Sequence, residues 1–315
     1  MNIVVTDGYL LNPGDLSWEP IRQFGHLTVY DRTAPSEVVE RCRFADIALT
    51  NKTVFSAETL AQLPKLQFIS VLATGYNVID VQAARKQGII VSNVPGYGTA
   101  TVAQHTFSLI LELTNHVGLY ASSVGKHEWE RSADWSYNLK RVSELEGKIL
   151  GIVGFGNIGQ QVAKIAAAFG MEIRYSSRTK KDIAYAQFTD LQTLFSGSDI
   201  ISLHCPLQTD NHQIVNKRLL NIMKSSALLI NTARGQLIHE EDLAEALNQN
   251  RIAGAGLDVL STEPPLANNP LLTAKNCIIT PHIAWNSLES RTRVLHTTVK
   301  NISAFMQRSP VHVVN

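Results

Sequence analysis

Three side chains suited to acid–base chemistry each follow a short apolar run in the last third of the chain. The runs are 226–230 before Arg234, 255–260 before Glu263 and 277–279 before His282. In an open parallel α/β sheet, ligands bind beyond the carboxyl ends of the strands, so three such ends can bring a guanidinium, a carboxylate and an imidazole together. This trio suits proton transfer to an anionic carbonyl compound.

A glycine-rich turn lies upstream of the trio, between an apolar run, 149–153, and a helix-like stretch, 160–169. In G-x-G-x-x-G, the first glycine permits the turn, the second lets the backbone approach a pyrophosphate, and the third lets the helix pack closely. Amides at the helix N-terminus then bind the phosphates. Three glycines alone are a weak signal, but the strand, the helix and the next strand fall in the right places, so a dehydrogenase is indicated. The expected dinucleotide-binding residues here are Gly154, Phe155, Gly156, Asn157, Ile158 and Gly159.

The end of the next strand, 172–175, bears on which dinucleotide binds. An acidic residue there would accept hydrogen bonds from the adenosine ribose, but the chain continues as Tyr-Ser-Ser-Arg-Thr-Lys-Lys over 175–181. No carboxylate in this stretch would repel a 2′-phosphate, Ser177 can donate a hydrogen bond, and Arg178 can hold a phosphate with its planar guanidinium. The sequence therefore predicts NADP(H) over NAD(H). The alternative is a solvated basic loop with moderate binding of NADH.

The bulk composition excludes several classes of protein. The 315 residues are 44% apolar and 17% charged, and the net charge of +1 gives no general reason to expect nucleic acid or an anionic membrane as a partner. Three cysteines without a C-x-x-C spacing indicate neither a disulfide framework nor a metal site, and they fit a reducing cytoplasm. The N-terminus resembles a short strand rather than a signal peptide, and no apolar run is long enough to span a bilayer.

The order of elements predicts an α/β fold with two Rossmann-like, doubly wound parallel-sheet domains and a cleft between them. Strand candidates in the first hundred residues are 3–5, 27–29, 47–49, 68–71 and 89–91. A helix is expected over 101–113, and the alternation of strands and helices restarts at Lys148. We expect residues 1–98 plus 288–315 to form a substrate domain and residues 99–287 to form the dinucleotide-binding domain. The last helical stretch, 288–306, would then return to the first domain.

The segment 125–141 breaks this pattern, because Trp129, Trp135 and Tyr137 stand among charged residues. It is either an exposed arm or partner-contacting surface, or an irregular loop anchored by buried aromatic side chains. The sequence leaves both interpretations open.

Several motifs in a fixed order carry a resemblance to a known family. They are ATGYNVID at 73–80, NVPG at 93–96, TVAQH at 101–105, the glycine turn, NTARG at 231–235, LDV at 257–259, TEPP at 262–265 and TPHIA at 280–284. Over nearly its whole length the chain resembles the D-isomer-specific 2-hydroxyacid dehydrogenases, and most of all their glyoxylate/hydroxypyruvate reductase (glycerate dehydrogenase) branch.

The resemblance implies a role for each member of the trio. His282 would be the general acid that protonates the carbonyl oxygen while hydride passes from the nicotinamide to the 2-carbon. Glu263 would hydrogen-bond His282 and stabilise the imidazolium, and Arg234 would bind the substrate carboxylate and polarise the carbonyl. Each residue alone could have a purely structural role. Purely structural roles for all three, next to a nucleotide-binding fold, are improbable.

The resemblance also implies further contacts. Backbone amides around Thr74 and Gly75 would hold the substrate carboxylate from the other domain, and Asp258 would meet the nicotinamide carboxamide. A homodimer is expected, with the helix from Thr101 and the aromatic arm as candidate contacts. Cys205 has no identifiable base and is not expected to be a nucleophile. The remaining residues expected beside the cofactor are His204, Cys205, Pro206, Thr232 and Ala233.

Two departures from the family pattern are Gln104, where many relatives have Glu, and Trp285, where smaller residues are frequent. Trp285 would narrow the pocket and favour a small substrate, so we expect glyoxylate or hydroxypyruvate to be reduced to glycolate or D-glycerate. One alternative is a D-lactate dehydrogenase or another 2-keto acid reductase of the same fold. A second is a non-catalytic, dinucleotide-sensing corepressor, which would tolerate alanine at Arg234 and His282.

Overall fold

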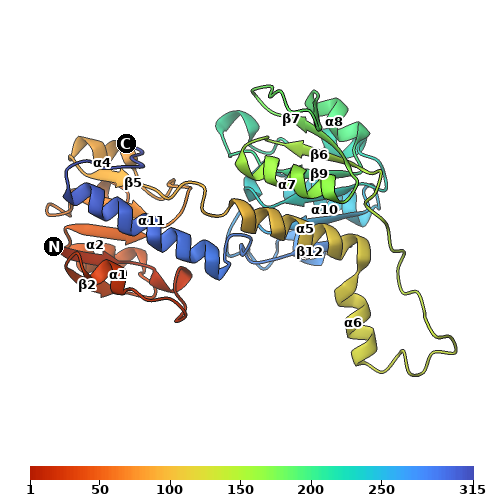
Figure 1. The fold of residues 1–315 in the computed structure, drawn as a ribbon, viewed down its shortest axis with the longest axis horizontal. Helices are drawn as coiled ribbons and strands as arrows, with labels where there is room; N and C mark the ends of the chain where they lie inside the picture. Colours follow the sequence, from red (N-terminus) through yellow and green to blue (C-terminus); the bar gives the residue numbers. More distant parts are fainter. The chain divides into compact units, whose positions relative to one another are not determined.

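A computed structural model describes all 315 residues, which form two compact units. One contains Met1–Gly98 and Asn286–Asn315, and the other contains Thr99–Trp285. Each is built on a sheet whose strands all run parallel, five strands in the first unit and seven in the second (Figure 1). The predicted fold class, two doubly wound parallel sheets covered by helices, is confirmed.

The first unit has the strand order β2-β1-β3-β4-β5. Its strands are β1 (Asn2–Val5), β2 (His26–Val29), β3 (Ile47–Thr50), β4 (Phe68–Val71) and β5 (Ile90–Ser92). Its helices are α1 (Glu19–Arg22), α2 (Val38–Cys42), α3 (Ala57–Ala61), α4 (Val81–Lys86) and α11 (Leu288–Met306). Residues of β3 and β4 are buried throughout, which is why these strands read as continuous apolar runs rather than alternating ones.

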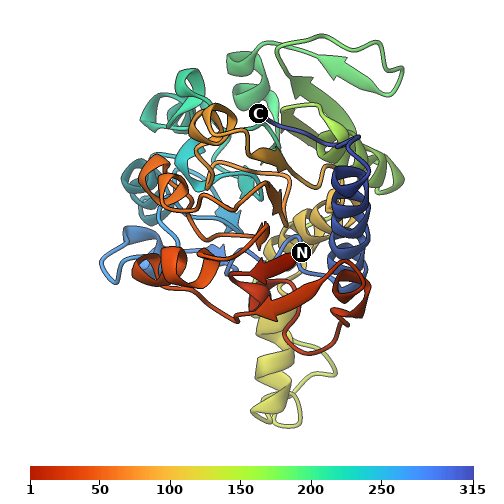
Figure 2. The same ribbon diagram turned by 90° about the vertical axis from the view of Figure 1, so that its left-hand side faces the viewer.

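The C-terminal helix α11 belongs to this first unit although it follows the second in sequence (Figure 2). The Phe305 ring stacks on Phe68 of β4 with 4.6 Å between ring centroids. Beyond the helix, the Val314 amide donates to the Val91 carbonyl at 2.9 Å. The end of the chain is therefore tied to the edge of the five-stranded sheet.

The second unit has the strand order β12-β11-β10-β9-β6-β7-β8. Its strands are β6 (Ile149–Val153), β7 (Glu172–Ser176), β8 (Ala186–Phe188), β9 (Ile200–Leu203), β10 (Leu228–Asn231), β11 (Gly254–Leu257) and β12 (Cys277–Ile279). From β6 the chain adds strands first on one side, as β7 and β8, and then on the other, from β9 to β12. The boundary between β6 and β9 is therefore a topological switch point, where doubly wound sheets bind ligands. The glycine-rich turn begins directly after β6.

Helices bury both faces of the seven-stranded sheet. They are α5 (Thr99–Asn115), α7 (Asn157–Ala168), α8 (Leu191–Gly197), α9 (Lys217–Ile222) and α10 (Glu240–Asn248). Successive β10 side chains enter opposite cores, as strand geometry requires: Ile230 packs with residues of α5 and α7, and Leu229 with residues of α8, α9 and α10. None of the helices is both long and apolar enough to cross a membrane.

Helix α6 (Val117–Gly125) and the segment after it project from the second unit (Figure 1). Trp129 and Trp135 are 53% and 88% exposed, whereas Tyr137 is half-buried and its hydroxyl lies 2.6 Å from Ser123 Oγ. The interpretation of this segment as an irregular loop anchored by buried aromatic side chains is therefore wrong for both tryptophans, and the exposed-arm interpretation fits. We call residues 117–142 the arm.

Candidate active site

The three predicted strands β10, β11 and β12 lie next to one another in the sheet, so their carboxyl ends share one edge. Arg234 follows β10, Glu263 follows β11 and His282 follows β12. The common edge is what brings residues separated by up to 48 positions, 234 to 282, into one region.

His282 and Glu263 form a direct pair. Nδ1 of His282 lies 2.6 Å from Oε2 of Glu263, and the two side chains are 25% and 35% exposed. The other carboxylate oxygen, Oε1, accepts from the Leu260 amide at 3.1 Å. Because Nδ1 faces the carboxylate, Nε2 is the ring atom that can exchange a proton with a substrate.

The loop that carries His282 is fixed by Asp258, which is 1% exposed. Its Oδ1 accepts from Thr280 Oγ1 at 2.6 Å and from the Ile283 amide at 2.9 Å, and its Oδ2 accepts from the Ala284 amide at 2.8 Å. The His282 amide donates to the Asp258 carbonyl at 2.9 Å, and His282 itself has φ 53°. The left-handed backbone at a non-glycine residue persists here because hydrogen bonds on both sides determine it.

Arg234 stands at the end of a turn organised by Asn231. The buried Asn231 side chain donates to the Arg234 carbonyl at 2.8 Å and accepts from the Ala233 amide at 3.0 Å. The Arg234 guanidinium is half-buried, and its Nη1 donates to the Ala233 carbonyl at 2.6 Å. Thr232 is buried, with its Oγ1 3.1 Å from Thr106 Oγ1 on α5. The Asx turn at Asn231 fixes the backbone that carries Arg234.

The glycine turn fits a dinucleotide on geometric grounds. Gly154 has φ +91°, and a Cβ there would meet the Cys205 amide nitrogen at 2.5 Å, while a Cβ on Gly159 would overlap the Gly154 carbonyl oxygen. A Cβ on Gly156 would meet nothing within 4 Å, and no side chain caps the α7 N-terminus there. The protein thus needs glycine at the outer two positions for its own packing, and at Gly156 it leaves open space in which a phosphate group can approach the backbone.

The three flanking residues of this turn differ in their surroundings. Phe155 is 2% exposed and its ring stacks on Tyr175 at 4.0 Å, so only its backbone can face a ligand. Asn157 is exposed at the first turn of α7, and Ile158 is half-buried against the core.

The segment after β9 lies against this turn. The His204 amide donates to the Val153 carbonyl at 2.7 Å, and the His204 ring points inward, with Nε2 2.8 Å from the buried Ser202 hydroxyl. Desolvation lowers the pKa of His204 to about 3, although the residue keeps part of its surface exposed. Burial raises the pKa of the Cys205 thiol, which argues against a nucleophilic role, and Pro206 is exposed.

One premise of the cofactor prediction is corrected by the structure. The sequence has no carboxylate at the end of β7, but Asp210, from the turn Thr209–Asn211, accepts from Arg178 Nη2 with both oxygens at 2.8 Å. Both side chains are exposed. Ser177 Oγ donates to the Thr179 carbonyl at 2.7 Å. A 2′-phosphate would therefore compete with Asp210 for Arg178. No sequence pattern signals this pairing, because the two residues are 32 positions apart.

Thr74 and Gly75 belong to the first unit, on the loop that follows β4. Thr74 is exposed, its Oγ1 donates to the Val94 carbonyl at 2.8 Å, and its own carbonyl accepts from Asn93 Nδ2 at 2.7 Å. These bonds fix the loop from the chain segment after β5 and leave the Thr74 and Gly75 amides outside the bonding pattern of the sheet. No group of three or more His, Cys, Asp or Glu side chains is arranged to hold a metal ion.

Comparison with known proteins decides the family. A family model described as D-isomer specific 2-hydroxyacid dehydrogenase, NAD binding domain, matches residues 107–284, more than half of the chain. The chain belongs to the D-isomer specific 2-hydroxyacid dehydrogenase family. The resemblance predicted from the sequence is confirmed, and this dehydrogenase is an oxidoreductase that uses a nicotinamide dinucleotide.

The alignments of this dehydrogenase with individual relatives cover most or all of both chains. It is 47% identical over 321 residues to the hydroxypyruvate reductase of Blautia hydrogenotrophica, covering 100% of both chains. It is 39% identical over 285 residues to the glyoxylate reductase of Thermococcus litoralis, covering 88% of this chain and 86% of that protein. Among solved structures, an acyclic imino acid reductase in complex with NADPH and D-Arg matches with a TM-score of 0.88 at 33% identity over 100% of both chains.

Proposed function

We propose that this dehydrogenase reduces a small 2-keto acid, glyoxylate or hydroxypyruvate, to glycolate or D-glycerate. The observation that carries the proposal is the pairing of His282 Nδ1 with Glu263 Oε2 at 2.6 Å, beside the strand end that bears Arg234. A relative named hydroxypyruvate reductase at 47% identity supports the choice of substrate. The half-buried Trp285, next to the His282 loop, supports a small substrate.

The residues divide the reaction among them. The chemistry that the dinucleotide would supply when bound is hydride transfer to the 2-carbon of the keto acid. His282, with Nε2 turned away from Glu263, gives its proton to the carbonyl oxygen, and the Glu263 carboxylate stabilises the imidazolium before the transfer. Arg234 binds the substrate carboxylate through its guanidinium. In the first unit, the amides of Thr74 and Gly75 are the group we propose for binding a carboxylate.

The same division gives each unit a role. The residues of the second unit that would hold the dinucleotide are the glycine turn, the His204–Pro206 segment and the Thr232–Ala233 turn, and Asp258 is the residue we propose for the nicotinamide carboxamide. The first unit is the substrate domain. The cofactor preference we propose is NADP(H) over NAD(H), since Arg178 can bind a 2′-phosphate, and a solved relative with the same fold is in complex with NADPH.

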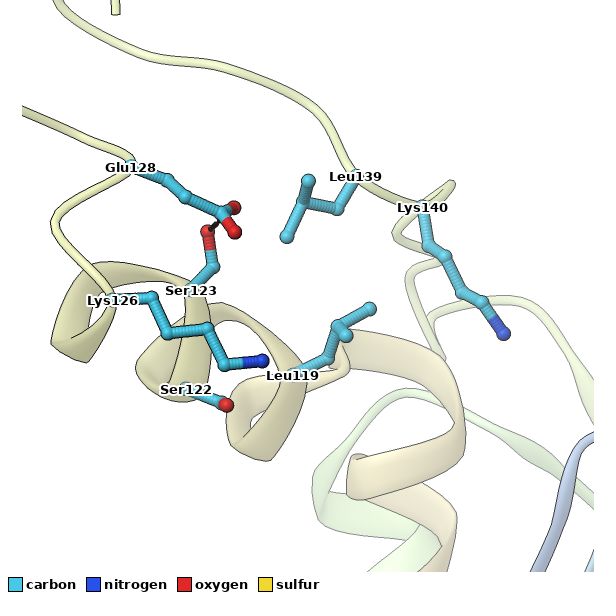
Figure 3. A pocket seen from close by; sticks show the side chains of 7 residues that line it. All are labelled: Leu119, Ser122, Ser123, Lys126, Glu128, Leu139 and Lys140. Atoms are coloured by element: carbon cyan, nitrogen blue, oxygen red, sulfur yellow. Dashed lines mark hydrogen bonds between the residues drawn. The ribbon is translucent and has the colours of Figure 1, made fainter. Parts of the chain in front are cut away.

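We further propose a cytoplasmic homodimer that contacts its partner through the arm. Three free thiols suit a reducing compartment. The arm is well organised within one chain: Ser123 Oγ donates to Glu128 at 2.5 Å, and Trp129 Nε1 donates to the Trp135 carbonyl at 2.9 Å. Figure 3 shows a hollow between α6 and the returning segment, lined by Leu119, Ser122, Ser123, Lys126, Glu128, Leu139 and Lys140. Order combined with exposed tryptophans is typical of a surface that a second copy covers.

The test is a set of initial rates with NADPH and with NADH against glyoxylate, hydroxypyruvate, pyruvate and a branched 2-keto acid. We expect the fastest turnover with NADPH and one of the first two. Preference for pyruvate would favour a D-lactate dehydrogenase instead, and preference for NADH would overturn the role given to Arg178.

The Asp210→Asn variant tests the cofactor site directly. Exposed ion pairs contribute at most about 1 kcal/mol, so release of Arg178 should lower the KM for NADPH by up to about fivefold and leave the KM for NADH unchanged. An equal change for both cofactors would argue that Arg178 does not contact the 2′-phosphate.

A further inference from the structure

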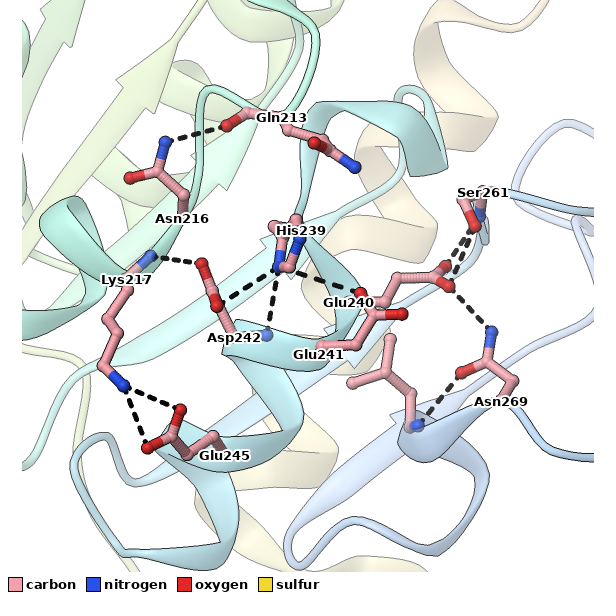
Figure 4. A network of polar contacts seen from close by, with 11 residues as sticks. Gln213, Asn216, Lys217, His239, Glu240, Glu241, Asp242, Glu245, Ser261 and Asn269 are labelled. Carbon is pink, nitrogen blue, oxygen red and sulfur yellow. Dashed lines mark hydrogen bonds and ion pairs between the residues drawn. The ribbon is translucent and has the colours of Figure 1, made fainter.

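Glu240, the first residue of α10, is a charged side chain that the protein buries. It is 8% exposed. The neighbouring Glu241 and Glu245 are exposed, and they pair with His239 and Lys217, respectively (Figure 4). In Figure 4 the Glu240 carboxylate points the other way, toward Ser261 and Asn269. A buried carboxylate is costly unless its oxygens accept hydrogen bonds, so its partners indicate its purpose.

Those partners flank Glu263 in the chain: Ser261 lies two residues before it and Asn269 six residues after it. Oε1 of Glu240 accepts from the Ser261 amide at 2.7 Å, and Oε2 accepts from Ser261 Oγ and Asn269 Nδ2, both at 2.8 Å. The carbonyl of Ser261 in turn accepts from Gln236 Nε2 at 2.8 Å. Every polar group of Ser261 is therefore held by the segment that follows Arg234.

Backbone packing reinforces this connection. A Cβ on Gly235 would overlap the backbone of Leu260 and Ser261, so the turn after Arg234 rests directly on that peptide. The Leu260 amide donates to Glu263 Oε1 at 3.1 Å, and Glu263 Oε2 contacts His282. The chain of contacts runs from Glu240 through the Leu260–Ser261 peptide to Glu263 and then to the imidazole.

We propose that Glu240 is a positioning residue for the reaction. It holds the Leu260–Ser261 peptide against the turn of Arg234, and so fixes the Glu263 carboxylate toward His282 Nδ1 at a set place relative to the guanidinium. This inference rests on the roles proposed above for Glu263 and His282. Asp242 and Glu245 on the same helix pair instead with Lys217, His239 and Gln249, none of which contacts the Leu260–Ser261 peptide.

Glu240→Gln is the sharpest variant, because it keeps the size of the side chain and removes one acceptor. The new amide would direct N–H groups at the Ser261 amide or at Asn269 Nδ2, and Asn269 cannot turn over without losing the bond from the Leu271 amide to its Oδ1, 3.0 Å long. One donor then faces another, and the segment carrying Glu263 is released.

The expected kinetic result in the reductive direction is a kcat about tenfold lower, with the KM for the keto acid changed less than about twofold, since loss of orientation acts on the proton transfer. Weaker stabilisation of the His282 imidazolium also means that kcat begins to fall at a lower pH. The alkaline limb of the kcat profile therefore shifts toward lower pH. Ser261→Ala, which removes one donor to Glu240, should move that limb in the same direction by a smaller amount.

Two controls separate the outcomes. Glu245→Gln, on the exposed face of α10, should leave both kinetic constants and the pH profile unchanged. Glu263→Gln should move the alkaline limb at least as far as Glu240→Gln. A pH profile that moves in Glu263→Gln but stays in place in Glu240→Gln and Ser261→Ala, whatever their melting temperatures, would overturn the positioning role alone. A profile unmoved in Glu263→Gln would instead overturn the proposed function of the His282–Glu263 pair and this inference with it.

Discussion

Arg234 and His282, two of the residues for which we propose catalytic roles, each follow a buried polar residue that holds the backbone around them. Asn231 organises the turn of Arg234, Asp258 organises the loop of His282, and each makes at least two hydrogen bonds to backbone or side-chain groups. Buried groups of this type are rigid because an unmade bond leaves a desolvated donor or acceptor. The precision of the site therefore depends on residues whose loss also costs stability.

Asp258→Asn tests this dependence. The amide can accept only through one oxygen, so its N–H groups must face either the Ala284 amide or the Ile283 amide and Thr280 hydroxyl side of the loop. We expect the free energy of unfolding to fall by about 1–3 kcal/mol, and kcat to fall because the His282 loop moves. Urea unfolding measures the free energy of unfolding, and steady-state rates measure kcat.

Asp190→Asn is the matched control for Asp258→Asn. Asp190 caps α8 at an exposed N-terminus, where asparagine caps about as well as aspartate. Equal losses in the two variants would contradict the special status of Asp258.

His204 should make stability depend on pH. Its pKa is about 3 in the folded protein against an ordinary value of 6.5, so the unfolded chain binds the extra proton first as the pH falls. Stability is therefore full above about pH 6.5 and is lost as the pH decreases toward 3, with a slope of up to about 1.4 kcal/mol per pH unit. The measurement is the melting temperature of the wild type and of His204→Asn between pH 7.5 and 5.5. The wild type should lose more over this range, and two parallel curves would show that the ring is not desolvated.

At the scale of elements, the glycines of the turn after β6 serve different purposes, and alanine at Gly156 and at Gly159 separates two of them. Gly156→Ala places its Cβ in open space at φ −76°, so stability should not change, but the dinucleotide should bind at least about tenfold more weakly because its phosphates approach the backbone there. Gly159→Ala overlaps the Gly154 carbonyl and should destabilise the protein even without ligand, by about 1–3 kcal/mol. Thermal unfolding of the apoprotein and a fluorescence titration with the dinucleotide measure the two effects. Unchanged dinucleotide binding in Gly156→Ala would place the pyrophosphate elsewhere.

Much at this scale could be predicted from sequence, because buried parallel strands are unmistakable apolar runs. Strand β4 and helix α11 begin and end where the sequence predicted, and β12 does as well. Strand β8 was missed, since Ala186–Phe188 lies at the sheet edge, largely exposed, with no alternating pattern. The partners Asp210 and Glu240 were also missed. Hydrogen bonds between loops far apart in sequence leave no periodicity, so nothing in the order of residues signals them.

At the scale of the whole molecule, the arm is the feature that a single chain does not explain. Its backbone is held by its own hydrogen bonds, from Tyr120 Oη to the Lys140 carbonyl at 3.0 Å and from the Leu139 amide to Tyr120 Oη at 3.0 Å, so its shape does not require a partner. What a partner would cover is apolar surface: Val117, Val124 and Leu139 are 61%, 44% and 41% exposed, and Trp135 is the most exposed of all the large apolar residues.

Trp135→Ala is therefore expected to weaken self-association without weakening the fold. The Trp129 side chain bonds to the carbonyl of residue 135, a contact that alanine retains, and a side chain that is 88% exposed contributes little to stability within one chain. Tryptophans that anchor an interface commonly contribute about 2–4 kcal/mol, so the dimer dissociation constant should rise about 30-fold or more. Sedimentation equilibrium measures this constant.

The control is Phe44→Ala. Phe44 is an aromatic residue of the first unit that is 61% exposed and contacts Lys65, and loss of the Phe44 ring should leave self-association unchanged. If the wild type sediments only as a monomer, or if both variants weaken the dimer equally, the arm is not the dimer contact, and its tryptophans must serve a different partner.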